Sequence, residues 1–149
     1  MTLKQILHRL GCIALLLLLA GRMYGQEGLA IASVFQKYAR QKGSTYVEMT
    51  QFKSQVWDAS LYKSLTVKRA AKVLPTIYEA LDKDRDKAKK VNEIVHDGVL
   101  RSGYYMFEPT GGKTNRFIVF RMQQDDTVYL LYIEGEITDE KMSRQIYGF

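Results

Sequence analysis

Hydrophobic side chains first recur with helical spacing shortly after residue 30. Apolar positions at i, i+3, i+4 and i+7 form one side of this stretch: Ile31, Val34, Phe35 and Tyr38. The spacing predicts an amphipathic helix, and Gly43 stands where a left-handed residue would end it. Residues 45–52 then alternate and are rich in β-forming side chains, which predicts a first strand.

The next part of the chain predicts a second strand and a second helix. Residues 53–62 fit either a helix or a strand, whereas residues 64–67 indicate a short strand. Pro75 is typical of the first turn of a helix, and the buried side of that helix would contain Ile77, Tyr78 and Leu81. Acids and bases alternate over residues 82–90, which is typical of a solvated helix end.

Asp97 and Gly98 form the strongest local signal in the chain. Both residue types tolerate the positive φ angles of a type I′ turn, so strands are expected at about residues 89–96 and 99–108. The alternative is that the preceding helix continues to Val95. Pairing across the turn would place four side chains on one face of the sheet: Val91, Val95, Leu100 and Tyr104.

Two further strands follow, each apolar on both faces. Residues 110–113 predict a turn, residues 115–122 a strand, residues 124–126 another turn and residues 128–133 a last strand. Thr138 would then cap a short C-terminal helix. Strands without alternation are covered on both sides, so these two strands need helices on both faces or a partner surface.

The order of elements predicts an α+β domain. It comprises an antiparallel β-meander of about four strands, one or two short N-terminal strands, and two or three helices. Neither a repeat nor a linker divides the chain, so residues 26–149 are expected to form a single domain. A homodimer is one way to cover the apolar strands.

The first 25 residues are typical of a secretory signal peptide, because a basic head precedes a short leucine-rich run and small residues. The run is too short to span a bilayer. Cleavage would remove Cys12, the only cysteine. It would also lower the net charge from +6 to +3, because 19 basic and 16 acidic residues remain. We therefore expect export to the periplasm or the outside of the cell, with no membrane span after cleavage.

The composition disfavours several function classes. A mature chain without cysteine has no thiolate ligand or thiol nucleophile, and the turn residue His96 would be its only histidine. The acids among residues 82–86 neutralise neighbouring lysines, so no basic stripe for nucleic acid forms. No metal or cofactor is expected, and no nucleic-acid partner.

Glu134 and Glu136 are the candidate catalytic residues. On an extended strand they share a face with Tyr132, with backbones about 7 Å apart, and paired carboxylates are what glycoside hydrolysis uses. The alternative is a strand end that enters solvent. The candidate binding residues are aromatic or charged: Tyr104, Tyr105, Tyr132, Arg116 and Glu134. Among them, Arg116 and Glu134 are expected to pair on neighbouring strands.

Four segments carry a family resemblance, and all of them lie in the predicted strands. They cover residues 61–67, 103–107, 115–120 and 130–135. In this order, behind a signal peptide, they resemble a family of small exported proteins of the Bacteroidales type that is known only as a domain of unknown function. The resemblance covers about residues 60–148 and implies an envelope location without any activity.

The sequence thus favours a non-enzymatic binding or protein-interaction domain. A face or an edge of its sheet would engage another envelope protein, a peptide or a second copy of the chain. The alternative is a small carbohydrate-active hydrolase that uses Glu134 and Glu136.

Overall fold

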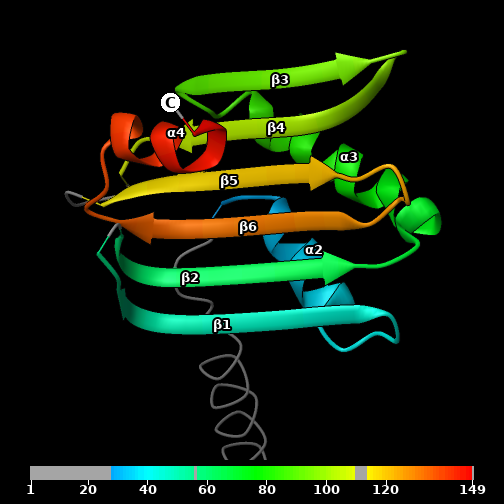
Figure 1. Cartoon of the computed structure of the whole chain (residues 1–149), viewed down its shortest axis with the longest axis horizontal. Coiled ribbons are helices and arrows are strands. Elements are labelled where there is room, and N and C mark those ends of the chain that lie inside the picture. The colour runs from blue at the N-terminus through cyan, green and yellow to red at the C-terminus, as the bar shows by residue number, and fades with distance from the viewer. Residues whose placement is uncertain (1–27, 56, 110–113, 149) are drawn as a thin grey trace, which may run out of the picture.

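The structure, a computed structural model, describes residues 28–55, 57–109 and 114–148. Six antiparallel strands form one sheet in the order β1-β2-β6-β5-β4-β3 (Figure 1). The strands are β1 (Ser44–Lys53), β2 (Asp58–Val67), β3 (Lys90–His96), β4 (Val99–Phe107), β5 (Asn115–Met122) and β6 (Val128–Gly135). The last four form the predicted meander, and β6 then pairs with β2.

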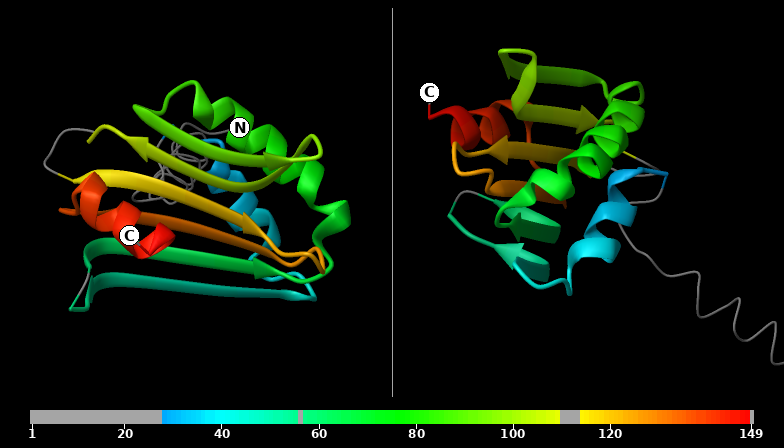
Figure 2. Two further views of the ribbon diagram at one scale, coloured as in Figure 1. Left: turned by 45° about the horizontal axis from the view of Figure 1, so that its top comes forward. Right: turned by 90° about the vertical axis from the view of Figure 1, so that its right-hand side faces the viewer.

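Within the described residues, three α-helices and one short 3-10 helix accompany the sheet. They are α2 (Ile31–Tyr38), η1 (Ala70–Lys72), α3 (Leu74–Arg85) and α4 (Asp139–Tyr147). Helices α2 and α3 lie on one face, and α4 lies on the other (Figure 2). The prediction of an α+β domain with an antiparallel sheet is therefore confirmed, although the sheet has six strands and the two N-terminal strands are as long as any other.

The core has one cluster on each face of the sheet. On the side of α2 and α3, Phe35 packs with Leu65 and Phe120, whereas Tyr104 and Phe117 lie on the side of α4. The strand β5 is buried at five consecutive positions, residues 116–120. The prediction that its two apolar faces need cover on both sides agrees with this arrangement.

Asp84 is the exception to the predicted solvated end of α3. Its carboxylate is fully buried and accepts hydrogen bonds from the backbone N–H groups of Ala30 at 2.6 Å and Ile31 at 2.9 Å. These groups belong to the start of α2, where N–H groups have no partner within the helix and the helix dipole favours a negative charge. Asp84 thus fastens α2 to α3, whereas its neighbours Asp82 and Arg85 are exposed.

The β3–β4 hairpin forms at the predicted turn. Asp97 and Gly98 have φ angles of 52° and 74°, as a type I′ turn requires. One of the four predicted face assignments is wrong. Val95 pairs with Leu100, but Tyr104 pairs with Asn92 and faces α4, because the register shifts between Ile94 and Val95 and the sequence pattern does not reveal this bulge.

Two further expectations at the N-terminal half need correction. The helix α2 ends at Tyr38, so Gly43 does not cap it but has its positive φ angle of 87° in the turn before β1. The strand β2 is not short, because it begins at Asp58. The sequence leaves its first half open between helix and strand, because Lys63 occupies an inward position, where it is only 7% exposed and interrupts the apolar alternation.

Three expectations fall wholly or partly outside the described residues. They are the signal peptide at residues 1–25, its cleavage, and the turn at residues 110–113. Among the described residues, none of the helices has the length and apolar composition needed to cross a membrane.

Candidate functional site

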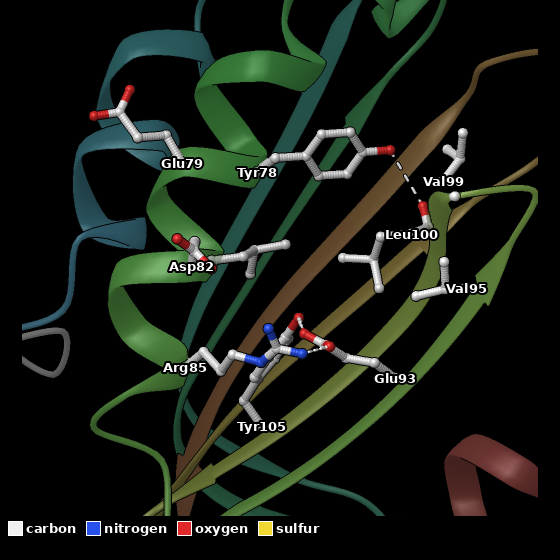
Figure 3. Close-up of a pocket in the computed structure, with 11 residues that line it drawn as sticks. Tyr78, Glu79, Asp82, Arg85, Glu93, Val95, Val99, Leu100 and Tyr105 are labelled. Carbon is white, nitrogen blue, oxygen red and sulfur yellow. Dashed lines mark hydrogen bonds and ion pairs between the residues drawn. The ribbon is translucent and has the colours of Figure 1, made fainter.

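A groove of about 520 Å³ lies between α3 and the β3–β4 hairpin (Figure 3). One wall is the exposed side of α3, with Glu79, Asp82 and Arg85 at successive turns. The opposite wall is the hairpin, which contributes Val95 and Val99. The remaining lining residues are Tyr78, Leu81, Glu93, Gly98, Leu100 and Tyr105.

One end of the groove is bridged by charged and phenolic groups. The Arg85 guanidinium forms an ion pair with Glu93, so a side chain of α3 reaches across to β3. The Tyr105 hydroxyl donates a hydrogen bond to Glu93 Oε1 at 2.7 Å. Burial, followed by this hydrogen bond to Glu93, raises the pKa of the Tyr105 phenol. The phenol is therefore a protonated donor near neutral pH, and not a base or a nucleophile.

Gly103 makes room for the Tyr105 ring. A Cβ atom at position 103 would lie 2.6 Å from the Tyr105 hydroxyl oxygen and 2.7 Å from the ring carbon Cε2. The ring therefore leans over the backbone of Gly103, which is the Cα partner of Glu93 on β3. Glycine inside a strand often marks such a close approach, and here it is a side chain that approaches the backbone.

Tyr78 closes the other end of the groove. Its hydroxyl donates to the backbone carbonyl of Leu100 at 3.2 Å (Figure 3). Its ring packs against Phe120 with centroids 5.8 Å apart. The helix is thus held to β4 at this point. Between the two ends, Leu81 is only 2% exposed and gives the groove an apolar floor.

The strand β3 beside the groove is an edge of the sheet. Its side chains Val91, Ile94 and Val95 are 38%, 53% and 57% exposed. They make up three of the five exposed large hydrophobic side chains among the described residues. An edge strand offers unpaired N–H and C=O groups to an incoming strand, and exposed aliphatic side chains favour such pairing.

The structure separates the aromatic residues that the sequence singled out. Tyr104 is fully buried on the α4 face, where its hydroxyl donates to Asp139 Oδ1 at 2.6 Å. Tyr105 lies on the opposite face and lines the groove. Phe107 is only 1% exposed. These rings are core residues and do not form one open stacking surface.

Arg116, Tyr132 and Glu134 come together on the face that α2 and α3 cover. Arg116 and Glu134 are Cα partners across β5 and β6, in the expected neighbouring positions. The Tyr132 hydroxyl donates to Glu134 Oε2 at 3.0 Å, and burial, followed by the charge of Glu134, raises the pKa of this phenol. Arg116 is 8% exposed and lies over the Phe107 ring at 5.8 Å.

Glu136 does not join this cluster. It follows the end of β6, is exposed, and lines a separate depression of about 340 Å³ with Lys53 and Asp58. Glu134 does not line that depression. In the exposed turn, His96 Nδ1 lies 3.1 Å from Asp97 Oδ2. Within the described parts of the chain, no three His, Cys, Asp or Glu side chains are placed to hold one metal ion.

Sequence reasoning missed the groove, although it anticipated the hairpin beside it. Tyr105 was the one candidate binding residue that lies there, whereas Arg85 and Glu93 were not singled out. These two residues are eight positions apart, on the end of a helix and on the following strand, and no local sequence pattern predicts that they pair. The available signal was the set of aliphatic side chains on a strand that begins after a charged run.

The fold and the groove together define an α+β domain with an open, aliphatic edge strand beside a helix. A family model described as a family of unknown function (DUF6108) matches residues 18–146, and the chain belongs to this family. The match confirms the resemblance to a domain of unknown function and extends it toward the N-terminus. No curated protein and no solved structure matches the chain.

Proposed function

We propose that this protein is a non-enzymatic binding domain that takes an extended segment of a partner protein as a seventh strand beside β3. The observation that carries the proposal is the free β3 edge, which exposes Val91, Ile94 and Val95 and whose Val95 also lines the groove under α3. In strand addition, main-chain hydrogen bonds supply affinity, and pockets for alternate side chains supply specificity.

Contacts on both faces support the proposal because they hold β3 in place. Glu93 is tied to α3 through Arg85, and Lys90 Nζ is 2.6 Å from Asp139 Oδ2 on α4. A strand that is fixed on both faces is preorganised for an incoming segment, which reduces the ordering cost of binding.

Export to the cell envelope is part of the same proposal. It is supported by the pattern of residues 1–25, with a basic head, a short leucine-rich run and small residues at its end. The partner would then be another envelope protein.

The hydrolase alternative with Glu134 and Glu136 stays a prediction from the sequence. The described contacts do not favour it. Glu134 accepts a hydrogen bond from the Tyr132 hydroxyl, whereas Glu136 lines a depression to which Glu134 does not contribute. Glycoside hydrolysis needs two carboxylates that face one substrate from either side of its scissile bond.

The test is selection of nine-residue peptides from a random displayed library on the full chain. Val95→Tyr, which places a ring over the groove, should weaken the selected peptides at least tenfold. Val47→Tyr is the matched control, because Val47 is 40% exposed on the opposite edge strand, and it should leave affinity unchanged.

Backbone pairing has its own signature in the same selected peptide. Successive N–H groups of a strand point to opposite sides, so only every second N–H group of the peptide would pair with β3. N-methylation of the residues whose N–H groups face β3 should therefore abolish binding, whereas N-methylation of the residues between them should be tolerated. Two results would overturn the proposal. One is that no peptide distinguishes the full chain from Val95→Tyr, and the other is that both methylation patterns have the same effect on binding. A β3-mediated dimer of the chain, seen by light scattering, would also contradict it.

A further inference from the structure

We infer that the segment added to β3 carries an aliphatic side chain and, two residues away, a lysine or arginine. This inference rests on the proposed strand addition and deepens it by naming the chemistry of the occupant. It is drawn from the charges on the groove walls and from the length of the groove.

The walls of the groove have an excess of negative charge. Three lining side chains are acidic and one is basic, although the chain as a whole carries a net charge of +6. The basic one, Arg85, is already paired with Glu93. An incoming cation therefore meets the two remaining acids, which lie on the exposed rim of α3.

The two rim acids differ in what already neutralises them. Glu79 is 2.8 Å from Lys83 Nζ on its own helix. Asp82 is exposed and makes neither an ion pair nor a side-chain hydrogen bond with another described residue. Asp82 is consequently the principal carboxylate for a cation of the partner.

The floor of the groove favours an aliphatic side chain. Leu100 lies between the Tyr78 contact and the Arg85–Glu93 bridge, with Val95 on the strand side (Figure 3). The buried Leu81 of α3 also lines the groove. A side chain that buries apolar surface there gains about 25 cal/mol per Å². A charged side chain at the same place would lose hydration without meeting an unpaired partner.

The dimensions of the groove allow two side chains of the added strand. From Glu79 to Arg85 the helix rises about 9 Å. Residues i and i+2 of a strand share one face and are about 7 Å apart, so one can enter the groove while the other reaches the rim. The alternation of an added strand thus matches one apolar and one acidic subsite.

The experiment compares three versions of one peptide selected on the full chain. They differ at a single position, which lies two residues from the aliphatic residue that enters the groove. At this position they carry lysine, glutamine or glutamate. The affinities should fall in that order, with about a tenfold difference between lysine and glutamate at low salt and about twofold at 1 M salt, where the Debye length is about 3 Å.

Two variants of the exposed Asp82 sharpen the comparison. Asp82→Asn should reduce the difference to about threefold or less, and Asp82→Lys should reverse the order. Glu140→Lys makes the same change of charge on α4, on the other face of the sheet, and should keep the original order. Equal affinities of the three peptides, or an order that Asp82→Lys does not change, would overturn the inference.

The outcomes separate this inference from the proposed function. Peptides that lose affinity in Val95→Tyr but show no preference for charge contradict only the inference. Failure of every peptide to distinguish the full chain from Val95→Tyr contradicts the strand addition itself.

Discussion

The two edges of the sheet each have a helix on one face, and they differ in how the space toward that helix is filled (Figure 1 and Figure 2). At the β1 edge, Tyr46 fills the space toward α2, and its ring meets the Phe35 ring with centroids 6.2 Å apart. At the β3 edge, the side chains on the helix side are Val91, Glu93 and Val95, and the last two line the open groove under α3.

The strands also differ in what they expose. The ten residues of β1 include one exposed large hydrophobic side chain, Val47, whereas the seven residues of β3 include three. In addition, β1 is interrupted at Gln51, which has a φ angle of 55° and no Cα partner on β2. An interruption of the strand and polar side chains discourage pairing at an edge, so β1 is the protected edge and β3 the receptive one.

The largest expected change in stability comes from removing the aromatic ring that packs behind the protected β1 edge. Tyr46→Ala removes the ring that packs against Phe35 and should lower the free energy of unfolding by about 2 kcal/mol. Urea unfolding of the full chain measures the change. Tyr46→Phe is the control, because it keeps the ring and should cost much less. If both variants lose the same amount, the ring does not fill the space beside β1 and the contrast between the edges fails.

A smaller effect is expected at the receptive edge. Gly103→Ala places a Cβ atom 2.6 Å from the Tyr105 hydroxyl oxygen, so the ring must move and its hydrogen bond to Glu93 is lost. We expect a loss of about 1 kcal/mol of unfolding free energy, which is at the low end for overpacking. Thermal or urea unfolding checks it against Ser102→Ala, which adds no atoms next to the ring. Equal stabilities of the two variants would show that Tyr105 does not need the space above Gly103.

Local chemistry explains which parts of the fold the sequence predicts. The Asp97–Gly98 turn, the Pro75 helix start and the Thr138 cap depend on neighbours in the chain, and the structure contains all three. Thr138 accepts a hydrogen bond from the Lys141 N–H at 3.2 Å, as a capping residue does.

Long-range contacts explain the parts that it does not predict. Asp84 looked like part of a solvated charged run because its partners are the N–H groups of Ala30 and Ile31, more than 50 residues earlier. Lys63 broke the apolar alternation of β2 because it occupies an inward position opposite Tyr132 on β6. The groove depends on how α3 lies against β3, which no local pattern encodes.

The most direct test of strand addition is amide hydrogen exchange of the full chain with and without a saturating selected peptide. The account predicts that exchange in residues 90–96 slows at least tenfold, because N–H groups at the β3 edge gain partners, while residues 44–53 on β1 are unchanged. A bound peptide that leaves β3 exchange unchanged, or that protects β1 as much as β3, would contradict it.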